Sequence, residues 1–236
     1  MPLPKNSHPL YDLIIPSNNK KIKVRPMLTK EEKLLLLARE SSGEDDILNA
    51  VKQVVNNCII DDAIDIDKLA TFDIEFFFLK LRSLSINNIT KYSVIDNADN
   101  KVYTIEINLD DVIVKFPESI EKNIKISDDS GILMKYPEAS LFSDEEFSKL
   151  AGLVRFEEYT YRCIDKLYFG DEVFIFSDVS KADREEFMET LSIKDTNKIR
   201  DFLNDMPSLY YKGTYKNSEG TEREIVLTSL TDFFTL

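Results

Sequence analysis

The sequence predicts an α+β fold: a helical body with an inserted antiparallel β-hairpin module and short terminal hairpins. From residue 22 to 85, apolar residues recur at steps of three and four, which is the period of an amphipathic helix. From 89 to 136 the period changes to two, and clusters of turn residues separate short apolar runs. We therefore expect three segments: 1–88, an N-terminal hairpin plus three-helix block; 89–137, an antiparallel β module; and 138–236, a C-terminal helical part ending in a hairpin and an aromatic tail.

The N-terminal segment is predicted to begin with a β-hairpin, because Ile22 and Val24 alternate with basic residues directly after the turn sequence at 17–20. The first helix follows, since Thr29 and Glu32 have the spacing of a capping box. The basic cluster of the chain is expected on the outer face of the hairpin: Lys20, Lys21, Lys23 and Arg25.

The second and third helices are predicted to differ in the distribution of their apolar residues. The second, which starts near 43–46 and reaches Cys58, carries a single apolar stripe. The third starts at 71 or 73, reaches 84, and is apolar on nearly every side, so it is either buried or binds a partner. We expect at least two of its phenylalanines in the core, and Arg82 is a candidate to pair with Glu31 or Glu32. The candidate partner-binding residues on this helix are Phe76, Phe77, Phe78 and Arg82.

The remaining segments are predicted to alternate between strands and helices. The expected strands are 92–95, 102–109, 112–116, 123–126, 132–136, 209–215 and 224–227, and 173–176 is expected to be a short strand or a turn. A helix is expected from 150 to 167, ended by Gly170, and two more are expected after Ser180 and Thr196 as caps. A further capping box is expected at 143–146.

The C-terminal tail is unusually aromatic for a chain end. Chain ends are commonly frayed and polar unless they are held in place. The rings of the tail are therefore expected either to dock into the chain's own core or to insert into a partner. Three tail residues are candidates for partner binding, namely Phe233, Phe234 and Leu236.

Composition narrows the function classes. The 236 residues include 43 acidic and 30 basic side chains, which gives a formal net charge of −13. This charge disfavours nucleic-acid binding, which needs a basic face to displace counterions. No run approaches the roughly 20 apolar residues of a membrane span, and the N-terminus lacks the apolar core of a signal peptide. We therefore expect neither a nucleic-acid nor a membrane partner.

No catalytic, cofactor-binding or metal-binding residue is predicted. The single histidine, His8, lies in a segment with nothing to fix its geometry. Cys58 and Cys163 are expected to be buried free thiols, and the two cysteines with His8 are too few for a four-ligand zinc site. The acidic run 61–67 lacks the glycine and glutamate positions of a calcium loop, and no Gly-rich phosphate loop is present.

A series of short motifs extends along most of the chain. These are Arg25-Pro26, Leu28-Thr29-Lys30-Glu31-Glu32-Lys33-Leu34-Leu35, Asn56-Asn57-Cys58, Asp67-Lys68-Leu69, Phe72-Asp73-Ile74-Glu75, Phe77-Phe78-Leu79-Lys80-Leu81-Arg82, Met134-Lys135-Tyr136-Pro137, Met206-Pro207-Ser208-Leu209 and Asp232-Phe233-Phe234. Together they resemble the baseplate hub assembly proteins of T-even-type contractile-tailed bacteriophages. The resemblance implies a role in building the hub, with other hub or tail tape-measure proteins as partners. It also implies the host cytoplasm as location, and no known enzyme activity.

The expected function is that of a non-enzymatic assembly factor, or chaperone, which transiently shields sticky surfaces on hub or tape-measure subunits. An acidic surface would keep such a complex soluble. Three alternatives stay open at this stage. They are a permanent structural subunit of the hub, an acidic inhibitor of a host protein, and a carboxylate-based hydrolase with paired acids in a cleft.

Overall fold

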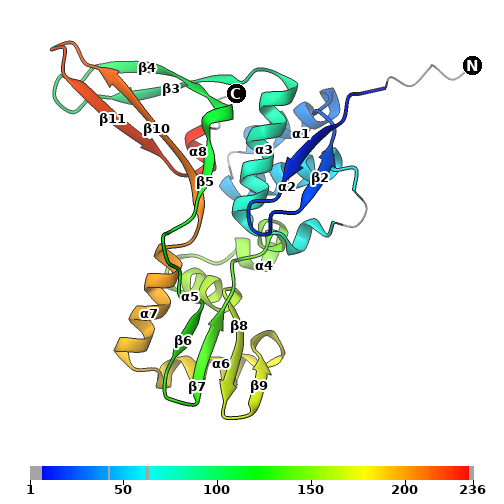
Figure 1. The fold of residues 1–236 in the computed structure, drawn as a ribbon, viewed down its shortest axis with the longest axis vertical. Helices are drawn as coiled ribbons and strands as arrows, with labels where there is room; N and C mark the ends of the chain where they lie inside the picture. Colours follow the sequence, from blue (N-terminus) through cyan, green and yellow to red (C-terminus); the bar gives the residue numbers. More distant parts are fainter. Residues whose placement is uncertain (1–6, 42, 62–63, 234–236) are drawn as a thin grey trace, which may run out of the picture. The chain divides into compact units, whose positions relative to one another are not determined.

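The computed structural model describes residues 7–41, 43–61 and 64–233, which fold into two compact units (Figure 1). Unit 1 comprises Met1–Lys115 and Ser208–Leu236, and unit 2 comprises Phe116–Pro207. Within the described residues, helices α1–α8 accompany small antiparallel sheets built from strands β1–β11. The predicted α+β fold class is therefore confirmed. In this part of the chain, no helix has the length and apolar content needed to cross a membrane.

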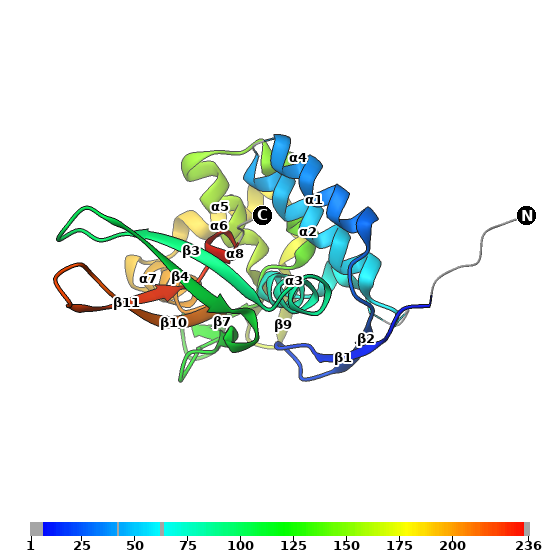
Figure 2. The same cartoon turned by 90° about the horizontal axis from the view of Figure 1, so that it is seen from above.

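Unit 1 begins with the predicted hairpin and three helices. The hairpin pairs β1 (Tyr11–Ile14) with β2 (Lys21–Val24), and the helices are α1 (Thr29–Ser41), α2 (Glu44–Cys58) and α3 (Thr71–Ser85). Helix α2 contacts both α1 and α3 (Figure 2). The apolar stripe of α2 explains this central place, because four of its members are fully buried: Val51, Val54, Val55 and Cys58.

The start of α1 differs from the predicted capping box by one residue. The helix begins at Thr29, so Leu28 is the residue before it, and the backbone N–H of Leu28 donates to Glu31 Oε2 at 2.9 Å. Glu31, rather than Glu32, is therefore the glutamate that caps the first turn. A leucine cannot cap with its side chain, which is why a search for Ser or Thr placed the box one position late.

Arg25 turns inward instead of decorating the outer face of the hairpin. Its guanidinium meets the fully buried Glu31 carboxylate, with Nη2–Oε1 at 2.9 Å and Nη1–Oε2 at 3.3 Å. The same group donates to the Asn57 carbonyl at 2.7 Å, at the end of α2. This arginine consequently joins β2, α1 and α2, and the predicted basic surface at this position is wrong because each of these partners lies within unit 1.

Unit 1 also contains two β-hairpins that lie side by side (Figure 2). One pairs β3 (Ile89–Ile95) with β4 (Val102–Asn108), and the other pairs β10 (Ser208–Lys216) with β11 (Glu222–Leu227). Their tips are joined by hydrogen bonds, because Tyr215 donates to Asp96 Oδ2 at 2.9 Å and Ser218 Oγ donates to Asp99 Oδ2 at 2.7 Å. The chain's last described helix is α8 (Leu230–Phe233).

Unit 2 is built on a four-stranded antiparallel sheet in the order β6-β7-β8-β9. The strands are β6 (Asn123–Lys125), β7 (Ser130–Met134), β8 (Ile164–Phe169) and β9 (Glu172–Ile175). Its helices are α4 (Glu145–Ser148), α5 (Gly152–Arg162), α6 (Lys181–Thr190) and α7 (Ile193–Asn204). The unit has a core of its own, which contains Ile124, Ile132, Met134, Cys163, Ile164, Leu167, Phe176, Ile199 and Phe202.

One face of the sheet of unit 2 packs on this core. On the opposite face, the ring of Tyr168 lies over Gly131. The register places Ile124, Ile132 and Leu167 side by side on the core face. On the opposite face, the Tyr168 hydroxyl donates to Asn123 Oδ1 at 2.8 Å. A Cβ on Gly131 would collide with this ring and, at 2.6 Å, with the Ile124 carbonyl, so only glycine fits there.

Three predicted elements of the C-terminal part are corrected. The helix expected from 150 to 167 ends at Arg162, and its last third forms β8. Gly170, with φ +57°, turns the chain from β8 into β9 and does not end a helix. Ser192 caps α7, since the Asp195 N–H donates to its hydroxyl at 3.2 Å.

The capping box expected at 143–146 is also displaced by one residue. Asp144 caps α4, because the backbone N–H groups of Glu146 and Phe147 both donate to its Oδ1 at 3.0 Å. The predicted spacing therefore located the turn correctly but assigned the cap to the neighbouring serine.

The structure divides the chain at 115/116 and 207/208, whereas the sequence predicted divisions at 88/89 and 137/138. Pairings between distant segments cause the difference. Strand β5 (Ile113–Lys115) pairs with β10, and β7 pairs with β8. The strands expected to form one β module thus belong to three sheets, because period-two patterning shows that a segment is a strand and says nothing of its partner.

Candidate protein-binding groove

Two of the four predicted site residues on α3 are core residues. Phe77 and Phe78 are 0% exposed, so neither ring offers surface to a partner in this structure. Phe76 is partly exposed, and its ring lies 5.1 Å from Lys80 Nζ and 6.4 Å from the Phe77 ring. The expectation that at least two of these phenylalanines are buried agrees with the structure, and the surface they could offer to a partner is reduced to Phe76.

The basic residues of α3 bind backbone carbonyls of unit 1. Lys80 Nζ donates to the carbonyls of Leu109, Asp110 and Val112 at 2.9–3.1 Å. Arg82 Nη1 donates to the Phe233 carbonyl at 3.0 Å, and Glu31, its predicted partner, pairs with Arg25. Both cations therefore hold the fold of unit 1 together.

Of the three tail residues predicted to bind a partner, the structure describes only Phe233. Phe233 is 1% exposed, and the hydrogen bond from Arg82 holds its backbone. For this ring the structure favours the alternative in which the tail docks into the chain's own core. The other two predicted tail residues, Phe234 and Leu236, lie outside the described residues.

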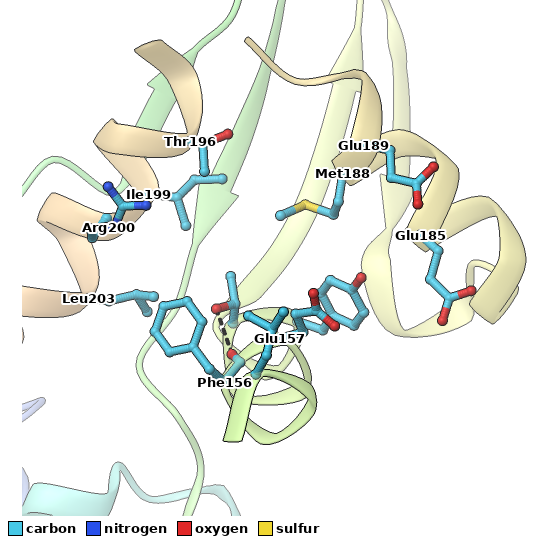
Figure 3. A pocket seen from close by; sticks show the side chains of 12 residues that line it. Phe156, Glu157, Glu185, Met188, Glu189, Thr196, Ile199, Arg200 and Leu203 are labelled. Carbon is cyan, nitrogen blue, oxygen red and sulfur yellow. Dashed lines mark hydrogen bonds between the residues drawn. The ribbon is translucent and has the colours of Figure 1, made fainter. Parts of the chain in front are cut away.

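Unit 2 has an apolar groove between α5, α6 and α7, with a volume of about 480 Å³ (Figure 3). Phe156 from α5, Met188 from α6, and Ile199 and Leu203 from α7 point into it. The size and the apolar lining are those of sites that bind ligands or segments of other proteins.

Helix α5 presents large apolar side chains to solvent beside this groove. Leu153 is 70% exposed, Val154 57% and Phe156 50%. The helix keeps its place because its other face contacts β8 and because Arg162, in its last turn, pairs with Glu158 at 2.8 Å and Asp144 at 2.7 Å. Adjacent exposed apolar side chains on one helix are typical of an interaction surface.

The rim of the groove is acidic on one side. Glu157 from α5 and Glu185 and Glu189 from α6 stand on that side, whereas Arg200 from α7 stands opposite and donates to Asn197 Oδ1 at 2.8 Å (Figure 3). Burial raises the pKa of Tyr161, which lines the groove, and the charges of Glu157 and Glu185 raise it further. Arg184 of α6 acts on Tyr161 in the opposite direction, so the acidic character of this side rests on its three exposed carboxylates, which favour a cationic partner group.

The decisive comparison is with protein families. A model of the family described as "T4 bacteriophage base plate protein" matches residues 8–235.

The chain belongs to the T4 bacteriophage base plate protein family.

No curated protein and no solved structure matches the chain. The family match covers both units, and it includes α5, α6 and α7 with the whole groove. Membership makes this a phage baseplate protein and agrees with the resemblance carried by the sequence motifs. It also implies interaction with other baseplate or tail proteins, so an exposed apolar groove is a relevant feature for a member of this family.

The side chains that could support covalent or metal chemistry are dispersed. Burial raises the pKa of the Cys58 thiol to about 11 and that of Cys163 to about 12, so both stay protonated at neutral pH and react slowly. His8 lines a separate hollow of unit 1 together with Leu28 and Leu35. Within the described parts of the chain, no group of three His, Cys, Asp or Glu side chains could hold a metal ion.

Sequence reasoning missed the groove because the groove depends on three helices, and two of them, α5 and α7, have other bounds than expected. The spacing of Leu153 and Phe156 fits the helix expected from 150 to 167, but periodicity cannot tell a buried apolar stripe from an exposed one. The useful signal was Val154, directly beside Leu153, because adjacent large apolar residues at a helix start widen the stripe beyond what one packing contact covers.

Proposed function

We propose that the chain is a non-enzymatic assembly factor for the baseplate hub, which holds hub or tail tape-measure subunits through the groove of unit 2 during assembly. Family membership supports a role in the baseplate. The choice of an assembly factor is supported by one observation above all: α5 exposes Leu153, Val154 and Phe156 beside a groove lined by Met188, Ile199 and Leu203. Contact between exposed apolar surface and water is unfavourable in free energy, so covering this surface with a partner stabilises the complex.

The acidic composition supports the same proposal. A protein that must carry apolar partner surfaces needs a surface that repels its own copies, and a formal net charge of −13 provides this repulsion. The partners would be other phage proteins in the host cytoplasm, and no chemical step is required of the chain.

The test is complementation of a phage that lacks this gene. Phe156→Glu places a charge at the groove, so it is expected to leave unit 2 folded and to reduce the yield of assembled hubs, counted by electron microscopy, by tenfold or more, roughly the effect of losing a central interface anchor. The matched control is Val173→Glu, since Val173 is 62% exposed on β9 and lies outside the groove. Normal hub assembly with Phe156→Glu would contradict the proposal.

A second measurement, on purified virions, distinguishes an assembly factor from a permanent hub subunit. An assembly factor acts and leaves, so mass spectrometry of purified virions is expected to find the hub subunits and not this chain. Its presence at the stoichiometry of a hub component would assign it instead to the finished baseplate.

A further inference from the structure

We infer that the occupant of the groove is an amphipathic helix of a partner protein, with Lys or Arg on the flank that faces α5 and α6. The inference rests on the proposed function and specifies the partner segment that the same groove takes. It follows from the shape of the groove and from the sign and position of the charges on its rim.

The shape favours a helix over an extended strand. The described residues that line the groove all belong to helices, so this lining offers no sheet edge for strand addition. Apolar side chains enter from three directions: Phe156 from α5, Met188 from α6, and Leu203 from α7 (Figure 3). A helix fits such a hollow by inserting anchors at positions i, i+3, i+4 and i+7.

The length of the lining supports the same occupant. On α7 the lining runs from Thr196 to Leu203, which spans about 10 Å at 1.5 Å per residue. A partner helix of about two turns, with anchors from i to i+7, would therefore cover the lined surface. Within this length it would bury the exposed parts of Leu153 and Phe156.

The charges assign the orientation of the polar flanks. Glu157, Glu185 and Glu189 stand on the α5 and α6 side, and the cation Arg200 stands on α7. In the described structure, Glu157 and Glu189 form no ion pair, and Glu185 meets only Lys181, at 3.7 Å with both side chains exposed. The acidic side thus has carboxylates available, and a partner flank bearing Lys or Arg would neutralise them.

The opposite flank has the complementary requirement. Arg200 donates to Asn197 and keeps a positive charge beside the α7 wall. An acidic or neutral polar residue suits this flank, whereas a lysine would be repelled. The predicted partner segment is therefore an apolar stripe with a basic flank toward α5 and α6 and an acidic or polar flank toward α7.

The inference is tested with designed peptides and the full chain. One peptide of about four turns has Leu at i, i+3, i+4 and i+7 with Lys on the flank that meets α5 and α6; the second replaces each of these Lys by Glu. Fluorescence anisotropy is expected to show the Lys peptide binding about tenfold more tightly, because attractive exposed pairs replace repulsive ones. The difference should shrink from about 0.1 M to about 1 M salt, as the Debye length falls from about 10 to about 3 Å.

A charge reversal in the protein provides the matched control. Glu157→Lys with Glu189→Lys is expected to invert the preference between the two peptides. Glu121→Lys with Glu172→Lys changes the net charge equally at exposed positions of unit 2 outside the groove, so it should leave the preference unchanged. All four positions are exposed, so these variants retain the fold and the comparison does not depend on a destabilised protein.

Several results would overturn the inference. These are failure of both peptides to bind, equal binding of both, or an equal effect of the two double variants. If the chain self-associates and Phe156→Glu abolishes this self-association, the groove binds a second copy of the chain instead of a partner helix. If neither peptide binds and Phe156→Glu still blocks hub assembly, the proposed function stands and the helical occupant is wrong; if the Lys peptide binds and the variant assembles hubs normally, the proposed function fails.

Discussion

Helices α3 and α5 are both rich in large apolar side chains, and they use them in opposite ways. In α3, Phe77 and Phe78 are completely buried and hold unit 1 together. In α5, Leu153 and Phe156 are at least half exposed, on a helix whose other face packs on β8. A helix that is apolar on nearly every side can bury all these side chains in the core and so stabilise its unit. A helix with more apolar residues than its packing face buries leaves apolar surface that a partner can cover.

The largest expected effect is on the stability of unit 1. Phe78→Ala removes a fully buried ring and is expected to lower the free energy of unfolding by about 3–5 kcal/mol. Phe156→Ala changes a half-exposed ring, so its effect should stay below about 1 kcal/mol. Urea titrations of both variants give the comparison, and similar losses for the two would remove the distinction between the helices.

The next effect concerns the start of α3. The Asp73 carboxylate is buried and accepts hydrogen bonds from the backbone N–H of Ser17 at 2.9 Å and of Ala70 at 3.2 Å. Asp73→Ala leaves both donors without this acceptor and is expected to cost about 2–4 kcal/mol. Glu106→Ala, on an exposed side chain of β4, is the control, and an equal effect of the two changes would show that these hydrogen bonds contribute nothing.

A smaller and pH-dependent effect is expected at Glu75 of α3. Burial raises the pKa of this carboxyl to about 7, above the ordinary value of about 4.3. Its contribution to stability is therefore fully present below about pH 4 and is lost as the pH rises through 7. Glu75→Gln should make the protein more stable than the wild type at pH 8, by about 1–3 kcal/mol, and about equal to it at pH 4.

Melting curves of the wild type and the glutamine variant across this range measure the difference. Glu106→Gln, at an exposed site, should show no such pH-dependent gain. A wild type that is as stable as Glu75→Gln at pH 8 would contradict the raised pKa.

The smallest effect is one of accessibility. Cys58 lies in unit 1 and Cys163 in unit 2, both fully buried. A thiol reagent should modify neither in the native protein, and rising urea should expose each as its own unit unfolds. Phe78→Ala is expected to shift the modification of Cys58 to lower urea and leave that of Cys163 in place, which peptide mass spectrometry resolves. A common shift of both thiols would show that the two units unfold together.

The α+β class, the N-terminal hairpin and the three helices after it could be predicted from the sequence because each depends on local periodicity. The stripe Val51, Val54, Val55 and Cys58 became the buried face of α2 as expected. The two-unit division could not be predicted, because it depends on β5 meeting β10 across about a hundred residues of chain. The groove was missed for a related reason, since it exists only where three separate helices converge.

Basic residues of the sequence motifs have a structural role in unit 1. The motifs that carry the family resemblance contain Arg25, Lys80 and Arg82, and each of these cations donates to backbone carbonyls inside unit 1. They are residues that hold the fold, and a basic side chain in a motif is not by itself a binding group. The partner surface that we propose lies instead in unit 2, where Leu153, Val154 and Phe156 of α5 are exposed beside the groove.

The most direct test of the central claim is site-specific photo-crosslinking in infected cells. A photoreactive phenylalanine analogue at position 156, in the groove, is compared with the same analogue at position 173, on β9 outside it. If the groove is the docking site, position 156 is expected to crosslink to a hub or tape-measure subunit during assembly, and position 173 is not expected to crosslink to that subunit. No partner crosslinked from position 156, or the same partner captured equally from both positions, would contradict the assignment of the groove as the docking site.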